Sequence, residues 1–464
     1  MQELASAELP QYVDNAMLAG LTGSVVQMTG LTASVADFPA PVGALVSIER
    51  QSGAGIEAEV VGFRDKQTLV MPLSSLDGIR RGSPVKLVRT SRTLRVGEGL
   101  LGRVVDARGR CVDGRPQPML HERLALQNEP PPATQRPQID QPLATGVKAI
   151  DGLLTCGQGQ RLGIFAGSGV GKSVLLGMMG RFTDADVTVI GLIGERGREV
   201  NEFIQRELGP AGLARSVVVV ATSNEPALLK VQAAYTATTI AEYFRSQGKN
   251  VLLVMDSITR FALAQREIGL SAGEPPTTRG YPPSVFSLLP KLVERAGKSP
   301  EGSITAFYSV LVEGDDENEP VADTMRGLLD GHVWLSRRLA EKGHFPAIDV
   351  LRSISRLTNE ITDPAVQQSA QLLRRLLAVL QENEDLLAIG AYRKGTNREI
   401  DVAVAIREEI NALLKQQINE HKPLEDVQAT LVQLAQKCAQ LLSNNVVGKA
   451  QQEPEATTPT ASEA

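Results

Sequence analysis

The amino-acid sequence predicts an α/β protein: a mostly parallel sheet with a phosphate-binding loop, preceded by a small β-barrel and followed by a helical domain. Three observations support this prediction. Apolar strand-like runs alternate with helical segments over residues 143–362, which is typical of a parallel α/β sheet. Short β-rich runs punctuated by Gly and Pro fill residues 23–95. Helical periodicity without a strand signal covers residues 363–450.

The phosphate-binding loop is the strongest local signal. A strand-like run and a helical segment that begins at Val174 flank a glycine-rich stretch: Ala166, Gly167, Ser168, Gly169, Val170, Gly171, Lys172 and Ser173. Glycines let successive N–H groups converge on a phosphate, and the N-terminus of the following helix adds positive potential. Lys172 can reach the β- and γ-phosphates, and the Ser173 hydroxyl can bind Mg²⁺. Ala166 replaces the usual first glycine at a position that needs only a small residue. The stretch predicts a nucleoside triphosphate site.

Two acidic residues follow other apolar runs. Asp256 ends the run that starts at Val251, and Glu195 follows the run 187–193 within a charged stretch. The carboxyl ends of parallel strands share one edge of a sheet, so Asp256 can hold Mg²⁺ there, usually through water. Hydrolysis needs an acceptor that orients water and takes its proton, and Glu195 could serve. On composition alone, a solvated charged loop is the more frequent explanation for Glu195.

Composition limits the classes of function. The chain has 464 residues and a formal net charge of −5, which argues against a broad nucleic-acid-binding surface. Its three cysteines are far apart and form no metal-ligand pattern. The first ten residues do not resemble a secretory signal, and no apolar run approaches the length of a membrane helix. We therefore expect a cytoplasmic protein.

The remaining segments divide the chain further. Residues 1–22 are either a frayed terminus or a partner-docking helix. Residues 96–142 form a connecting segment that ends in a Pro-rich linker, which favours extended backbone. Residues 451–464 are rich in Pro, Thr, Glu and Ala, and we expect this tail to be disordered.

Several blocks of sequence resemble a known family, the type III export ATPases, which are relatives of the catalytic subunit of the rotary ATP synthase. The matching blocks are residues 192–200, 273–276, 280–286, 302–308, 330–332, 346–349 and 353–356. The barrel runs 46–50, 59–63 and 71–73 look most like the flagellar members. The injectisome ATPases of virulence secretion systems are near relatives and stay open as an alternative.

The resemblance implies a RecA-like nucleotide domain and assigns catalytic roles. Lys172 would contact the phosphates, Ser173 and Asp256 would hold Mg²⁺, and Glu195 would polarise the attacking water. Glu199 would assist through the water shell of the magnesium ion.

The resemblance assigns roles to three further residues, described below. Arg260, which lies just after the apolar run that ends at Asp256, is one more candidate site residue. Arg356 matches an arginine finger that enters the site of a neighbouring subunit. Phe345 stands where relatives usually carry Tyr and would stack on adenine, and Tyr392 would close the other side of that pocket. A finger that acts in trans implies a homohexameric ring.

The implied function is ATP hydrolysis that drives type III protein export, with Mg²⁺ as the cofactor. The implied partners are a regulator that binds the amino-terminal segment, a central stalk protein, the membrane export gate and chaperone–cargo complexes, with peripheral membrane association and no specific nucleic acid. Two other classes stay open. A non-catalytic nucleotide-binding ring subunit would usually lack the Glu195 carboxylate, and an RNA-translocating hexameric ATPase would usually have basic and aromatic interleaving in its barrel.

Overall fold

The structure is a computed structural model that describes residues 20–312, 316 and 318–443. These described residues fall into two compact units: one lies within residues 20–138, 158–168 and 185–329, and the other within 139–157, 169–184 and 330–443. We describe each unit by itself. Most of the expected docking segment (1–22) and all of the tail (451–464) lie outside the described residues. The domain boundaries expected from the sequence stay predictions.

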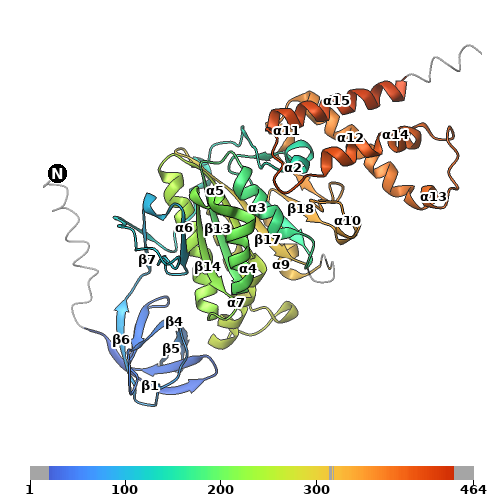
Figure 1. Cartoon of the computed structure of the whole chain (residues 1–464). Coiled ribbons are helices and arrows are strands. Elements are labelled where there is room, and N and C mark those ends of the chain that lie inside the picture. The colour runs from blue at the N-terminus through green and yellow to red at the C-terminus, as the bar shows by residue number, and fades with distance from the viewer. Residues whose placement is uncertain (1–19, 313–315, 317, 444–464) are drawn as a thin grey trace, which may run out of the picture. The chain divides into compact units, whose positions relative to one another are not determined.

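The first unit begins with a closed antiparallel barrel, visible in blue in Figure 1. Alternate residues of its strands face the core, as Ile56, Ala58 and Val60 do in β4. Around the barrel the strand order is β1-β2-β5-β4-β3-β6, so no strand edge is left unpaired. The strands are β1 (Thr22–Thr29), β2 (Thr32–Ala36), β3 (Leu45–Ile48), β4 (Ile56–Arg64), β5 (Gln67–Pro72) and β6 (Pro84–Arg89).

The segment expected to be only a connector contributes a strand to the central sheet. Its strand β8 pairs in parallel with β14, with Arg103 opposite Val217. Its strand β9 pairs antiparallel with β7, which lies mainly before the segment, in the range 23–95 expected for the barrel. Short apolar pairs such as Val104-Val105 give too little periodicity to reveal an edge strand in the sequence. The elements are β7 (Thr93–Val96), η1 (Glu98–Leu100), β8 (Arg103–Asp106), β9 (Glu122–Ala125) and η2 (Ala133–Gln135).

The central sheet confirms the α/β prediction. Within the first unit its order is β12-β17-β15-β13-β14-β8, and all these neighbours are parallel. Strand β13 is buried along its whole length, as expected for a sheet covered on both faces. The strands are β12 (Arg161–Ala166), β13 (Val187–Glu195), β14 (Ser216–Thr222), β15 (Asn250–Asp256), β17 (Ser303–Leu311) and the short antiparallel β16 (Gly297–Lys298).

Helices of the same unit cover this sheet (Figure 1). Helix α6 packs on β13, β14 and β15 and is buried over nearly all of its 20 residues, and α7 packs beside it. The helices are α4 (Gly197–Glu202), the π-helical η3 (Phe203–Leu208), α5 (Gly209–Ala214), α6 (Ala227–Ser246), α7 (Ile258–Ala272), η4 (Thr278–Gly280), α8 (Pro283–Val293) and α9 (Pro320–Leu328).

The second unit is mainly helical. Helices α12, α14 and α15 pack against one another and against α2, and periodic apolar residues of these helices, such as Ile406 and Leu431, are buried. The helices are α2 (Lys148–Leu153), α3 (Lys172–Phe182), α10 (Arg337–Glu341), α11 (Thr358–Ile361), α12 (Pro364–Glu382), α13 (Glu384–Ala388), α14 (Arg398–Leu414) and α15 (Leu424–Ser443). The strands are β10 (Pro142–Leu143), β11 (Cys156–Gly157), β18 (Gly331–Leu335) and β19 (Ile354–Ser355).

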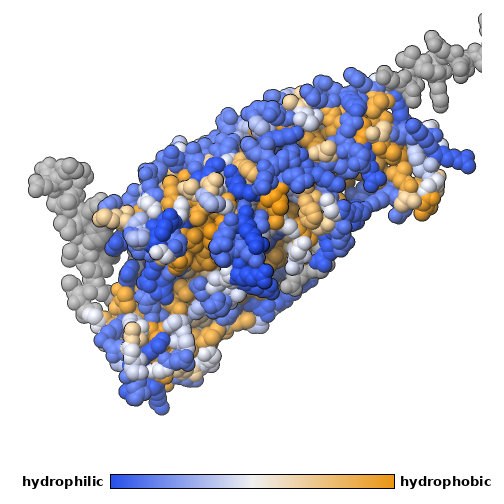
Figure 2. All heavy atoms as spheres, in the orientation of Figure 1, coloured by the Kyte–Doolittle hydropathy of each residue, from blue (hydrophilic) through white to orange (hydrophobic). Residues whose placement is uncertain are grey.

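The surface of the helical unit is mostly hydrophilic in Figure 2. An apolar area lies at the position of α13, where Leu386 and Ile389 are exposed. Among the described residues, no helix combines the length and the hydropathy that a membrane span requires.

A buried ion pair joins α6 to the chain after α8. The guanidinium of Arg295 donates two hydrogen bonds to the Glu242 carboxylate, at 2.8 and 2.6 Å, and others to the Leu126 carbonyl and the Thr239 hydroxyl. Every side of this charged group is therefore paired within the first unit. Removing one partner would leave the other charge buried without compensation.

We expect Arg295→Met to lower the free energy of unfolding of this unit by about 3–5 kcal/mol, because Glu242 would lose its counter-ion in a buried site. Urea denaturation followed by circular dichroism measures the change. The control is Arg198→Met, since Arg198 pairs with Glu202 on the surface, where such pairs contribute about 0–1 kcal/mol. Equal effects of the two substitutions would contradict the assigned role of Arg295.

Candidate nucleotide-binding and hydrolysis site

Three strands of the central sheet end at one edge and carry the predicted residues there. Strand β12 ends at Ala166, β13 at Glu195 and β15 at Asp256. The strands are parallel neighbours through β17, and Leu192 of β13 lies opposite Asp256 of β15. Carboxyl ends of parallel strands are where open α/β sheets bind ligands. Within this unit, the start of the glycine-rich loop, Glu195 and Asp256 therefore share one sheet edge.

The loop that follows β12 has the backbone expected of a phosphate cradle. Gly169 and Gly171 adopt positive φ angles of 80° and 89°, which other residues rarely adopt. Gly171 is the residue before α3, whose first turn carries Lys172, Ser173 and Val174. The helix N-terminus offers free N–H groups and positive potential to an anion. The loop can therefore bind phosphates through its backbone.

Glu195 is held by Arg260 of α7, the helix that follows β15. Its side chain is buried, and Arg260 Nη2 lies 3.3 Å from Glu195 Oε2. Arg260 also donates a hydrogen bond to the carbonyl of Gly194. Gly194 has a φ of 71°, and a Cβ there would lie 3.0 Å from the Arg260 side chain, so the close approach requires glycine. The contacts orient the Glu195 carboxylate at the sheet edge.

Glu199 of α4 forms a side-chain hydrogen bond with Glu195. This hydrogen bond lowers the pKa of Glu199, and the positive charge of Arg196 lowers it further. Arg196 Nη1 lies 3.1 Å from Glu199 Oε1. The two carboxyl groups thus form one acidic cluster with a shared hydrogen bond.

Asp256 is fixed by the neighbouring strand. It is 2% exposed, and its Oδ1 accepts a hydrogen bond of 2.7 Å from the Ser309 hydroxyl of β17. The peptide bond between Asp256 and Ser257 is cis, and Ser257 caps α7. Thr259 adds a second tie to β17, since its hydroxyl accepts the N–H of Leu311 at 2.9 Å. Sequence reasoning missed Ser309 and Thr259 because they reach the site only when β15 and β17 are paired.

Phe345 lines a cavity of about 450 Å³ in the second unit. The ring is 45% exposed, and a Cβ on Gly171 would lie 3.6 Å from it, so the ring packs against the end of the phosphate loop. Such a ring offers a stacking face for an adenine base. Other lining residues come from α3, from the chain on either side of Phe345 and from the chain after α14: Val174, Leu175, Met178, Gly343, Pro346, Lys415, Gln416, Gln417, Ile418 and Glu420.

Tyr392 is not among the residues that line this cavity, and its role at an adenine pocket stays a prediction. Its hydroxyl hydrogen-bonds the Asn397 carbonyl at 2.7 Å and Asp401 Oδ1 at 2.9 Å, at the start of α14. The opposite wall comes from the chain around Gln416, a buried residue that accepts the N–H of Lys148 and donates to the Gly146 carbonyl. No local motif marks Gln416 in the sequence.

We expect Phe345→Ala to weaken ATP binding by roughly 5–150-fold, since stacking of one base on an aromatic ring contributes about 1–3 kcal/mol. Phe345→Tyr should keep the affinity within about twofold because the ring remains. Titration with a fluorescent adenine nucleotide measures both. Equal losses in the two variants would show that the ring does not stack on the base.

Arg356 directly follows β19 and its side chain is exposed. Its backbone N–H donates a 3.0 Å hydrogen bond to the Asp330 carbonyl, which fixes the point from which the side chain leaves. An exposed arginine on a fixed backbone can reach a second molecule. Its action in a neighbouring subunit's site stays a prediction.

We expect Arg260→Ala to lower kcat by roughly 10²-fold, because small displacements of a catalytic group have effects of that size. Arg260→Lys should restore little, since one ammonium cannot reproduce the forked contact to Glu195 and Gly194. Steady-state kinetics separates this positioning role from nucleotide binding: KM should change much less than kcat. A change in KM alone would contradict it.

Three models of known protein families match successive parts of the chain. The family model of the ATP synthase alpha/beta nucleotide-binding domain matches residues 146–355, its beta-barrel domain matches 25–89, and the T3SS EscN ATPase C-terminal domain matches 362–433. The chain is 51% identical over 412 residues to the flagellum-specific ATP synthase of Bacillus subtilis, which covers 89% of this chain and 93% of the relative.

Two further similarities come from secretion systems. The SPI-2 type 3 secretion system ATPase of Salmonella typhimurium is 52% identical over 363 residues, or 78% of this chain and 84% of the relative. The assembled ATPase EscN of enteropathogenic E. coli, solved in complex with its central stalk EscO, has a TM-score of 0.83 and 44% identity, and the match covers 89% of this chain and all of EscN. The chain is therefore a P-loop ATPase of the ATP synthase alpha/beta family, and it belongs with the flagellum-specific ATP synthases and type 3 secretion system ATPases.

Proposed function

We propose that this chain hydrolyses ATP in a homohexameric ring and that the hydrolysis drives type III protein export, most directly of flagellar components. The observation that carries the proposal is the acidic residue Glu195, held by Arg260 at the same sheet edge as Asp256 and the start of the phosphate loop. A non-catalytic ring subunit would not need a carboxylate tethered at this place.

The residues fit a bound Mg²⁺. The Ser173 hydroxyl and the Asp256 carboxylate are hard oxygen donors, which this cation prefers. Bound Mg²⁺ would neutralise charge on the β- and γ-phosphates. Lys172 and the loop N–H groups would hold the phosphates, and Glu195 would orient water and accept its proton, with Glu199 beside it. Phe345 would position the adenine.

The ring and its partners are part of the proposal. The assembled EscN complex supports a ring with a central stalk protein for this chain as well. An amino-terminal regulator, a membrane export gate and chaperone–cargo complexes would complete the apparatus, with the ring associated peripherally with the cytoplasmic side of the inner membrane. The flagellar assignment is supported by the wider coverage of the B. subtilis relative. The injectisome ATPase is a second candidate because its identity to this chain is 52%, against 51% for the B. subtilis protein.

The test is Mg²⁺-dependent ATP hydrolysis over a range of protein concentrations, with particle mass measured in parallel. A site shared between subunits predicts specific activity that rises steeply as rings form. Activity carried by monomers would refute the shared site. Hydrolysis stimulated by RNA but not by export chaperones would favour a nucleic-acid translocase instead.

A further inference from the structure

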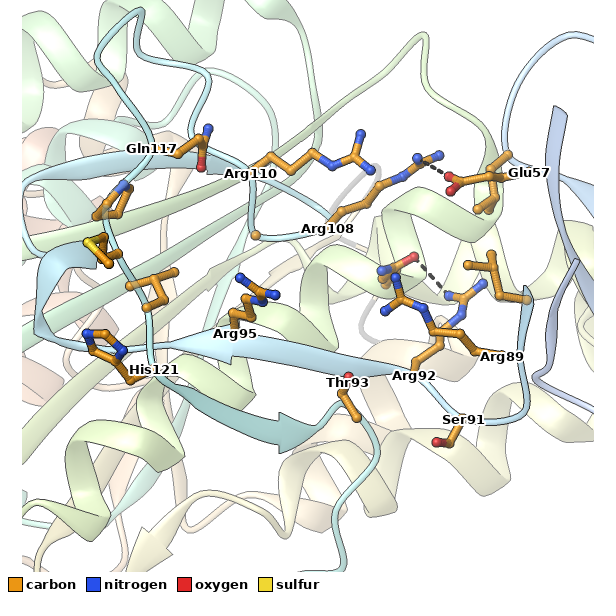
Figure 3. Close-up of a pocket in the computed structure, with 17 residues that line it drawn as sticks. Glu57, Arg89, Ser91, Arg92, Thr93, Arg95, Arg108, Arg110, Gln117 and His121 are labelled. Carbon is orange, nitrogen blue, oxygen red and sulfur yellow. Dashed lines mark hydrogen bonds and ion pairs between the residues drawn. The ribbon is translucent and has the colours of Figure 1, made fainter. Parts of the chain in front are cut away.

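A cavity of about 730 Å³ lies in the first unit, and the residues that line it are not part of the hydrolysis site. The barrel forms one side through Leu45, Leu73 and the end of β6, and the segment 91–121 forms the other. Figure 3 labels side chains around this space from β4, the end of β6, β7, the turn after β8 and the chain before β9. The walls thus come from several separate stretches of sequence.

The cavity is lined by five arginines and one histidine: Arg89, Arg92, Arg95, Arg108, Arg110 and His121. Two of the arginines have counter-ions, since Arg108 pairs with Glu57 and Arg92 pairs with Glu59. Among the described residues, no ion pair joins the other three arginines to a carboxylate. Glu57 is the only acidic residue in the lining, so positive charge is in excess.

A tight turn after β8 orients two of these arginines. Asp106 Oδ1 accepts the N–H of Arg108 at 2.8 Å and that of Arg110 at 2.9 Å, which closes a tight turn. Gly109 within the turn has a φ of 75°, and a Cβ there would lie 2.5 Å from the Leu94 side chain. The turn therefore depends on glycine and holds the two arginines on the side of the cavity. In Figure 3, Arg95 extends from β7 toward this turn.

Like charges gathered in one cavity repel each other unless an anion binds between them. Guanidinium groups match phosphoryl oxygens in forked, two-point contacts. The volume falls in the range of about 300–1,000 Å³ that is usual for small-molecule sites. Because the charges surround one hollow instead of following a strand or groove, the geometry suits a compact ligand better than an extended peptide.

We propose that this cavity binds a small polyanion that carries two or more phosphoryl groups, held by Arg89, Arg95 and Arg110. Ser91, Thr93 and Gln117 supply further hydrogen-bonding groups in the lining, and Met119 provides an apolar wall. Arg92 already links the barrel to α6 through Glu59 and Gln232. A ligand in the cavity would strengthen the connection between the barrel and the nucleotide domain.

The test uses the full chain with Lys172→Ala, so that the phosphate loop does not compete for the probe. Binding of sodium tripolyphosphate is measured by calorimetry at low salt. The double variant Arg95→Gln/Arg110→Gln should weaken binding about tenfold or more, because it removes two charge-assisted contacts. The control is Arg80→Gln/Arg81→Gln, which removes the same charge from exposed positions on the barrel side of the same unit and should change the Kd by less than about twofold.

Circular dichroism melts of both double variants check that the fold is kept. Equal weakening in the two double variants, or none in either, would overturn the proposal. Hexaglutamate is the second probe. If it binds more tightly than tripolyphosphate and loses affinity in the Arg95→Gln/Arg110→Gln protein, the cavity recognises an acidic polypeptide, and the small-ligand proposal is wrong.

Discussion

Glu195→Gln should lower kcat for ATP hydrolysis by about 10²–10⁴-fold, the usual contribution of a positioned general base. The amide keeps the size of the side chain and can still contact its surroundings, but it cannot accept the proton of the attacking water. ATP affinity should change little, because Glu195 ends β13 and is not part of the phosphate loop. Single-turnover kinetics with separate binding titrations measures both quantities.

A matched control for this substitution is Glu202→Gln. Glu202 is the last residue of α4, the helix that follows Glu195. On the surface, its Oε1 lies 2.9 Å from Arg198 Nε. The substitution should leave hydrolysis within about twofold, since exposed pairs of this kind contribute little. Hydrolysis that survives in Glu195→Gln would assign the base elsewhere, with Glu199 the first residue to test because it shares a hydrogen bond with Glu195.

Arg356→Ala should lower kcat by about 10³–10⁵-fold, as loss of an arginine finger does in other phosphoryl-transfer systems. The reason is electrostatic: charge that develops on the transferring phosphoryl group would lose its neutralising guanidinium. The residue is exposed in the single chain, so its removal should not alter the fold. Arg337→Ala, at another exposed position in the same unit, serves as the control and should keep full activity.

Mixing the two inactive proteins tests whether the finger acts between subunits. In a mixed ring, an Arg356→Ala subunit retains Glu195, and an adjacent Glu195→Gln subunit retains Arg356. With random assembly in equal amounts, about a quarter of the interfaces would be complete, and activity should return to that order. No recovery despite ring formation would mean that Arg356 acts within its own chain or not at all.

Local patterns revealed the fold class and the nucleotide loop. Phosphate binding depends on consecutive backbone N–H groups, so the loop from Ala166 to Ser173 can be recognised as one continuous stretch of sequence. The strands β3 to β6 can be predicted from the sequence for a similar reason, because their apolar residues cluster or alternate over short distances. Strand β8 cannot be predicted in this way, since it is short and belongs to a sheet whose other strands lie far along the chain.

The sequence by itself determined the α/β class, the phosphate loop and the acidic strand ends at Glu195 and Asp256, and the family resemblance added Phe345 and Arg356. Only the tertiary structure brought Arg260 to Glu195, placed Gln416 at the Phe345 cavity, and gathered arginines from three segments around one hollow. The physical reason is the same in each case. Backbone conformation follows from neighbouring residues, whereas the meeting of distant side chains depends on strand order and helix packing.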